Sequence, residues 1–175
     1  MDSTTFYTRL MGIKAFIFDM DGVLTDGFIS LEKDGVMSRR FHTRDGSAMV
    51  RAVKKGFVFG IISAGYNQAC EDRFRNMNVQ HIYMNARPKL PYYKEILKLS
   101  NLKAEEVLYM GDDIADMQCI YASGIGVCPK DSCSDVLEIA DYVCQNNGGQ
   151  TAVREVIELV LKAQNKWDLP ELINV

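Results

Sequence analysis

An α/β domain with a doubly wound parallel sheet is the fold that the sequence predicts. Apolar runs of strand length alternate about five times with segments of helical periodicity, as they do when crossover helices join parallel strands. Hydrophobic residues make up 47% of the chain and charged residues 25%, the balance of a globular protein with a core. Because 175 residues fit one such domain, we expect residues 1–175 to form a single domain with its core over about 13–164.

The expected strands are short stretches rich in apolar, aromatic and β-branched residues. In chain order they are residues 14–19, 57–62, 80–84, 107–110, 125–128 and 142–144. The expected helices follow the strands and are residues 44–55, 67–76, 91–100, 115–122, 131–139 and 151–164. Gly56 marks the end of the first of these helices, and the tail 165–175 is left unassigned.

One segment departs from the alternation, and it comes directly after the first strand. Residues 27–31 and 36–42 flank Lys33-Asp34-Gly35, and Asp-Gly between two such segments predicts a β-hairpin. We therefore expect a hairpin flap over about 27–42. Its Arg39 and Arg40, with Arg44 just beyond, form either a solvated face or a contact for an anionic substrate.

Charge and composition exclude several classes of protein. Lys plus Arg is 20 and Asp plus Glu is 23, so the formal charge of −3 offers no domain-wide basic surface for nucleic acid. The longest apolar runs are far below the length of a membrane span, and the first 12 residues lack the regions of a signal peptide. The five cysteines show no C-x-x-C spacing and are expected to be buried, reduced thiols. We expect a cytoplasmic protein that binds neither nucleic acid nor membrane.

Polar side chains gather where the expected strands end. Asp19 ends the first strand and Asp21 comes two residues later. Ser63 and Asp112 follow two other strands, and Lys89 opens a helix. The carboxyl ends of parallel strands meet at one edge of a sheet. Clustered carboxylates favour a hard cation such as Mg²⁺, and a lysine with a hydroxyl suits a phosphate. These residues predict Mg²⁺-assisted phosphoryl transfer, in which an aspartate serves as nucleophile and a carboxyl two residues on moves the proton.

Four ordered motifs resemble those of the haloacid dehalogenase superfamily of phosphatases. They are D-M-D-G-V-L-T at 19–25, Ser63 after the second expected strand, Lys89, and G-D-D-I-A-D at 111–116. Within the superfamily the chain is similar to the small capless branch of 3-deoxy-D-manno-octulosonate 8-phosphate phosphatases. That similarity lies in L-T-D-G at 24–27, R-D-G at 44–46 and the G-G-x-x-A-V-R-E-V pattern at 148–156. The resemblance covers about residues 14–164.

The resemblance implies a Rossmann-like sheet without a cap domain, and it implies roles for the acidic motif residues. Asp19 would be the nucleophile and a Mg²⁺ ligand, and Asp21 would be the general acid/base with its backbone carbonyl on the metal. Asp112 would be the third protein ligand. Asp113 and Asp116 would not bind the metal directly but would support the residues that do.

The resemblance also implies that Ser63 and Lys89 hold the phosphoryl group, and that a homotetramer closes the site with neighbouring hairpins and C-terminal segments. This sequence departs from the branch at Gly65 and Gln150, where an arginine is usual. Arginine is the preferred clamp for a carboxylate. Arg44, Gly65 and Gln150 are the expected substrate-facing positions.

The expected activity is Mg²⁺-dependent hydrolysis of a phosphorylated sugar or sugar acid through an aspartyl-phosphate. The octulosonate 8-phosphate is the first expected substrate, and a nonulosonate 9-phosphate or another phosphosugar is the alternative. Two other classes are possible in principle. A bacterial receiver domain would need its phosphoacceptor aspartate after the third strand, where Asn85 stands. A non-catalytic assembly module of this fold would have lost catalytic residues that this chain retains.

Overall fold

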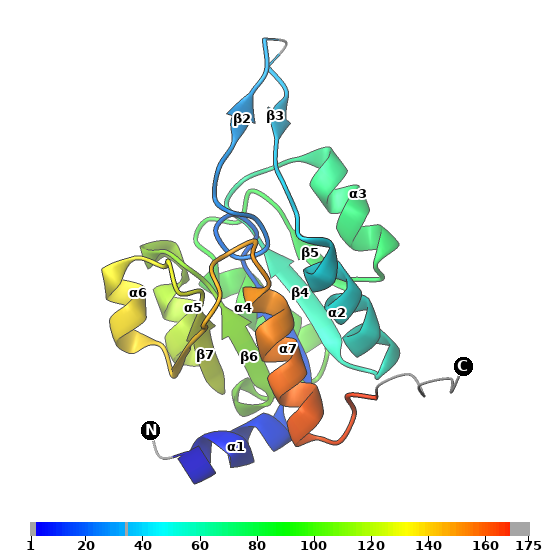
Figure 1. Ribbon diagram of the computed structural model, residues 1–175, viewed down its shortest axis with the longest axis vertical. Helices are drawn as coiled ribbons and strands as arrows, with labels where there is room; N and C mark the ends of the chain where they lie inside the picture. Colours follow the sequence, from blue (N-terminus) through cyan, green and yellow to red (C-terminus); the bar gives the residue numbers. More distant parts are fainter. Residues whose placement is uncertain (1–2, 34, 169–175) are drawn as a thin grey trace, which may run out of the picture.

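Six parallel strands form the central sheet of the computed structural model, which describes residues 3–33 and 35–168 (Figure 1). Their order across the sheet is β5-β4-β1-β6-β7-β8. The bounds are β1 (Ala15–Phe18), β4 (Val58–Ile62), β5 (His81–Tyr83), β6 (Val107–Met110), β7 (Ile125–Cys128) and β8 (Tyr142–Val143). All six expected strands are present, and their parallel pairing confirms the predicted fold class.

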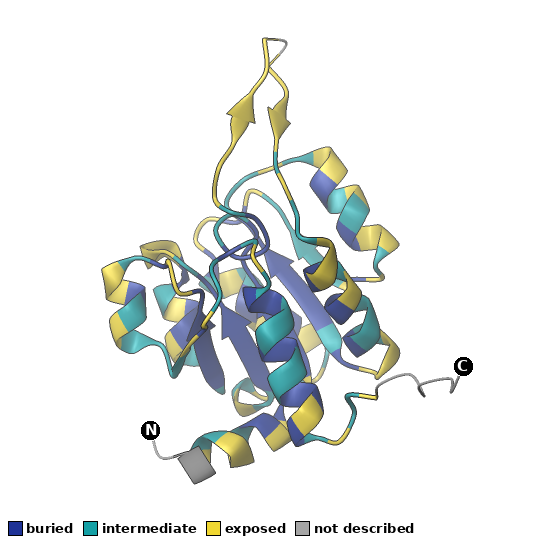
Figure 2. Ribbon diagram, in the orientation of Figure 1, coloured by how far each residue is buried: buried dark blue, intermediate teal, exposed yellow. Residues whose placement is uncertain are grey.

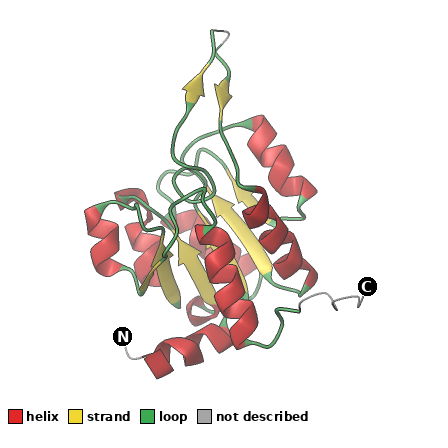
Figure 3. Cartoon of the chain, in the orientation of Figure 1, coloured by secondary structure: helices red, strands yellow, loops and turns green. Residues whose placement is uncertain are grey.

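Helices cover both faces of the sheet (Figure 3). They are α1 (Ser3–Gly12), α2 (Thr43–Lys54), α3 (Gln68–Asn76), α4 (Leu90–Leu99), α5 (Met117–Ala122), α6 (Ser134–Ile139) and α7 (Ala152–Ala163). In β1, Phe16 and Phe18 pack in a core with side chains of α1, α2, α3 and α7. Ala15 and Ile17 point to the opposite face and pack with α4, α5 and α6, because side chains alternate across a strand.

The helix Ser3–Gly12 is absent from the sequence-based expectation. Its ten residues show only a weak apolar stripe, and tertiary contacts hold it instead. Arg9 pairs with Asp141 at 2.8 Å, and Gln164 donates to the carbonyl of Leu10 at 3.0 Å. Propensity and periodicity are local signals, so a helix stabilised by distant partners escapes them.

The hairpin after β1 is present, but its strands are shorter than expected. β2 (Ser30–Leu31) and β3 (Met37–Ser38) pair antiparallel and project beyond the carboxyl ends of the main strands (Figure 1). Both strands are exposed (Figure 2), and the side chains of Phe28 and Leu31 are each 77% exposed. Among the described residues, the hairpin is the segment inserted between β1 and α2 at this edge of the sheet. The described residues contain no cap domain.

Three smaller observations bear on the earlier expectations. All five cysteines are free. Four of them are buried as expected, whereas Cys133 is half-buried, so the expected burial is wrong for that residue. Among the described helices, none combines the length and the apolar character needed to cross a membrane. Of the unassigned tail, residues 165–168 are described, and Trp167 lies 4.7 Å below the guanidinium of Arg51.

Candidate active site

Strand register brings the predicted polar residues to one edge of the sheet. Phe18 at the end of β1 lies beside Ile61 of β4 and Met110 of β6. The residues that follow are therefore neighbours, and the amide of Asp19 donates to the carbonyl of Met110 at 3.0 Å. This edge bears a cavity of about 360 Å³. Eight of the predicted site residues line it: Asp19, Asp21, Ser63, Gly65, Lys89, Asp112, Asp113 and Asp116.

Lys89 joins two carboxylates at the floor of this cavity. Its side chain is 2% exposed, and its Nζ lies 2.9 Å from Oδ2 of Asp19 and 2.6 Å from Oδ1 of Asp116. Burial alone would lower the pKa of Lys89, but these two carboxylates raise it above its ordinary value. Lys89 is therefore a fixed cation beside Asp19.

Asp116 positions both Lys89 and the loop that carries the fourth motif. The hydroxyl of Tyr109 in β6 donates to Oδ1 of Asp116 at 2.6 Å, and the amide of Asp112 donates to Oδ2 at 3.3 Å. Gly111 permits this packing, because a Cβ there would overlap the Asp116 side chain. The sequence analysis treated Tyr109 only as part of its strand. Its hydroxyl, in an otherwise apolar strand, was the one sign that it could bind a polar group of the site.

The carboxylates of Asp19, Asp112 and Asp116 form a group that fits a metal ion. Each residue places one carboxylate oxygen within 4.8 Å of those of the other two. Oδ1 of Asp112 is buried and has no hydrogen-bond partner among residues 3–33 and 35–168. Burial and the charge of Asp116 raise the pKa of Asp19 well above its ordinary value and that of Asp112 to about 7. A hard cation with oxygen ligands, such as Mg²⁺, would relieve this repulsion and satisfy the open oxygen.

Asp21 lies apart from that group and pairs with the hairpin. Nε of Arg39 lies 2.7 Å from Oδ1 of Asp21, and Nη2 lies 3.0 Å from Oδ2. The hydroxyl of Thr25 also donates to Oδ1 at 3.3 Å. Arg39 was noted in the sequence only as part of a basic cluster, and its place in the cavity comes from the fold of the hairpin.

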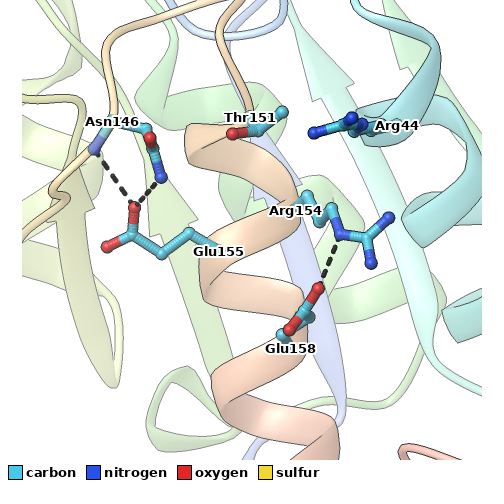
Figure 4. Close-up of a pocket in the computed structure, with 6 residues that line it drawn as sticks. All are labelled: Arg44, Asn146, Thr151, Arg154, Glu155 and Glu158. Carbon is cyan, nitrogen blue, oxygen red and sulfur yellow. Dashed lines mark hydrogen bonds and ion pairs between the residues drawn. The ribbon is translucent and has the colours of Figure 1, made fainter. Parts of the chain in front are cut away.

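Arg44 and Gln150, two of the expected substrate-facing residues, lie outside this cavity. Arg44 lines a separate hollow of about 320 Å³, where it faces Thr151 and Arg154 at the start of α7 (Figure 4). Gln150 lines another hollow, with Asp26 and Arg40 among its neighbours. Of the three expected substrate-facing positions, the single chain brings only Gly65 to the cavity that the aspartates line.

Known proteins share both the sequence pattern and the architecture. Residues 73–157 match the family of haloacid dehalogenase-like hydrolases. The chain is also 34% identical over 166 residues to 3-deoxy-D-manno-octulosonate 8-phosphate phosphatase KdsC of Salmonella typhi, across 95% of this chain and 88% of that protein. The chain belongs to the haloacid dehalogenase-like hydrolases. The resemblance expected from the four motifs is confirmed.

Solved structures of such hydrolases superpose closely on this one. The phosphatase of the same description from Yersinia pestis has a TM-score of 0.90 at 33% identity, covering 91% of this chain and 86% of its own. The phosphatase from Moraxella catarrhalis, in complex with a magnesium ion, a phosphate ion and a KDO molecule, has a TM-score of 0.92 at 29% identity. That match covers 95% of this hydrolase and 96% of the other chain.

Proposed function

We propose that this hydrolase is a Mg²⁺-dependent phosphatase that acts on a phosphorylated sugar acid, with 3-deoxy-D-manno-octulosonate 8-phosphate as its first candidate substrate. The observation that carries the proposal is the buried contact of Asp19 with Lys89 beside Asp112, at the carboxyl edge of the sheet. The KdsC relatives, which share most of the chain, support the choice of substrate.

In the proposed reaction, a carboxylate oxygen of Asp19 attacks phosphorus and the bond between phosphorus and the ester oxygen breaks. Asp21 donates a proton to the departing sugar oxygen. Asp21 then takes a proton from water as that water attacks the aspartyl-phosphate, which releases phosphate and restores the Asp19 carboxylate.

Lys89 and Ser63 supply the groups that hold the phosphoryl oxygens in this proposal. Lys89 offers a buried ammonium, and Ser63 is 1% exposed at the end of β4. Asp19 and Asp112 would hold Mg²⁺ by their carboxylates, with the carbonyl of Asp21 completing the protein ligands. When bound, the ion offsets negative charge on the phosphoryl oxygens and on the carboxylates.

Hydrolysis of p-nitrophenyl phosphate tests the proposal without assuming a sugar. We expect Mg²⁺-dependent turnover that stops with a chelator, and loss of turnover by at least about 10³-fold in Asp19→Asn because the nucleophile is removed. Asp72→Asn, an exposed aspartate on α3, is the matched control and should keep the wild-type rate. Near-normal turnover in Asp19→Asn would contradict the nucleophile assignment.

The proposal includes a homotetramer in the cytoplasm. Exposed apolar side chains on the hairpin, among them Phe28 and Leu31, favour assembly through this flap. The free cysteines suit a reducing compartment. Gly65 and Gln150 replace two arginines of the octulosonate branch, so the sugar must be identified by experiment. A comparison of kcat/KM over octulosonate and nonulosonate phosphates would identify it.

A further inference from the structure

A hairpin arginine occupies the space above Gly65 in the active-site cavity. The side chain of Arg39 is 3% exposed although most of the hairpin is open to solvent. A Cβ on Gly65 would lie 3.3 Å from Nη2 of Arg39 and 3.4 Å from Oδ2 of Asp21. The distance to Arg39 is tighter than ordinary van der Waals contact, so the missing side chain at position 65 leaves room for this guanidinium.

The guanidinium has donors to spare. Arginine carries five N–H groups, and the pair with Asp21 uses the edge formed by Nε and Nη2. Nη1 is buried and has no hydrogen-bond partner within the described part of the chain. The edge formed by Nη1 and Nη2 therefore remains for a second carboxylate, which arginine binds through two parallel hydrogen bonds.

We propose that Arg39 determines specificity by binding the carboxylate of the phosphosugar acid. This inference rests on the proposed function and names a recognition residue for the same site. In a pyranose sugar acid, the carbon with the carboxylate and the carbon with the phosphorylated side chain both bond to the ring oxygen. The two anionic groups can therefore lie in one cavity of about 360 Å³, with the phosphate at Lys89 and the carboxylate at Arg39.

The same contact links substrate binding to the general acid/base. Both carboxylate oxygens of Asp21 accept a hydrogen bond from Arg39. A substrate carboxylate draws the guanidinium toward itself and leaves an oxygen of Asp21 open to the sugar oxygen. A substrate without that carboxylate lacks this effect, so the inference predicts discrimination in turnover as well as in binding.

The test compares a charged and a neutral form of one sugar. The substrates are 3-deoxy-D-manno-octulosonate 8-phosphate and its C1 methyl ester, which adds one methyl group and removes the negative charge of the carboxylate. The variant is Arg39→Gln, which removes the cation and leaves a shorter, neutral polar side chain. The matched control is Arg40→Gln, the next residue along, whose side chain is 86% exposed and pairs with Asp26 outside the cavity. Thermal melting of each protein verifies folding.

We expect the wild type to prefer the acid over the ester by about 30-fold in kcat/KM, the size typical of a charged hydrogen bond. Arg39→Gln should lose most of this preference, and Arg40→Gln should retain it. Equal losses on both substrates in Arg39→Gln, or a wild type with no preference, overturn the inference. If p-nitrophenyl phosphate is still hydrolysed in that case, the proposed phosphatase activity stands. A wild type that hydrolyses none of the three phosphates overturns the proposed function.

Discussion

At the scale of single residues, the active site depends on one buried cation among carboxylates. Lys89 contacts Asp19 and Asp116, and Asp116 also accepts from Tyr109 and from the backbone of the fourth motif. Replacing only one partner of a buried ion pair lowers stability strongly, because the charge of the other partner stays buried without compensation. Lys89 therefore stabilises the fold of this edge, and the proposed reaction gives it phosphoryl binding as a second role.

Replacement of Lys89 tests this double role. In Lys89→Met, we expect the free energy of unfolding without Mg²⁺ to fall by about 3 kcal/mol, because Asp19 and Asp116 lose their partner. Urea denaturation measures the change, and Lys98→Met on the exposed side of α4 is the control. A variant as stable as the wild type would show that the buried pair contributes little.

The open oxygen of Asp112 leads to a prediction about the metal. Mg²⁺ at about 100 times its dissociation constant should stabilise the fold by about 2.7 kcal/mol. In a chain of this size that corresponds to a rise in Tm of roughly 5–10 °C. Asp112→Asn should lose most of this rise. The Tm of chelated and Mg²⁺-loaded protein is the measurement, and identical values in the wild type would contradict a metal site here.

At the scale of elements, α2 supplies the cap that α7 lacks. Thr151 precedes α7 with a φ of 78° and makes no side-chain cap. Oδ1 of Asp45, in the first turn of α2, accepts instead from the amide of Arg154 at 2.7 Å. Asp45 belongs to the R-D-G segment, and the structure gives this residue a helix-capping role.

Protonation of the buried Asp45 carboxyl should change the free energy of unfolding with pH. Burial raises the pKa of Asp45 above its ordinary 3.8, although the contact with Arg154 opposes the shift. Folding therefore favours the protonated form, so the contribution of Asp45 to stability grows as pH falls from its raised pKa toward 3.8. Asp45→Asn lacks this titration. The unfolding free energy of the wild type, relative to the variant, should rise on acidification, and a pH-independent difference would refute the assignment.

At the scale of the whole molecule, the hairpin is an apolar projection from a well-packed domain. The residues of β2 and β3 are exposed, whereas those of β1, β6 and β7 in the sheet are buried (Figure 2). Large exposed apolar side chains on one projection mark a contact surface. The proposed tetramer would cover them and close the cavity against water.

Light scattering tests that assembly. The wild type should have four times the 19.7 kDa mass of one chain. Leu31→Glu on the hairpin should lower the measured mass, because a charge would be buried at the contact. Leu99→Glu, at a 62% exposed leucine of α4, should leave the mass unchanged. A monomeric wild type would contradict the tetramer.

Local patterns were sufficient for most elements and for the polar residues that gather at the carboxyl edge of the sheet. The six strands and the helices α2 to α7 follow from apolar periodicity, and Asp19, Ser63 and Lys89 follow from their places after strands. Element ends were less accurate: the helix expected from 115 begins at Met117, because Ile114–Asp116 forms a 3₁₀ turn capped by Asp113. Helix α1 was missed because its stabilising partners are distant in sequence.

The sequence by itself determined the α/β class, the sheet edge where the motif residues gather and the family, because strand periodicity and motif order are local properties of the chain. Only the tertiary structure decided which charges meet. It paired Lys89 with Asp116 and set Arg39 over Gly65, and it separated Arg44 and Gln150 from the cavity that the aspartates line. These contacts depend on how a hairpin and several loops fold over the sheet edge, and spacing along the chain does not encode such distances.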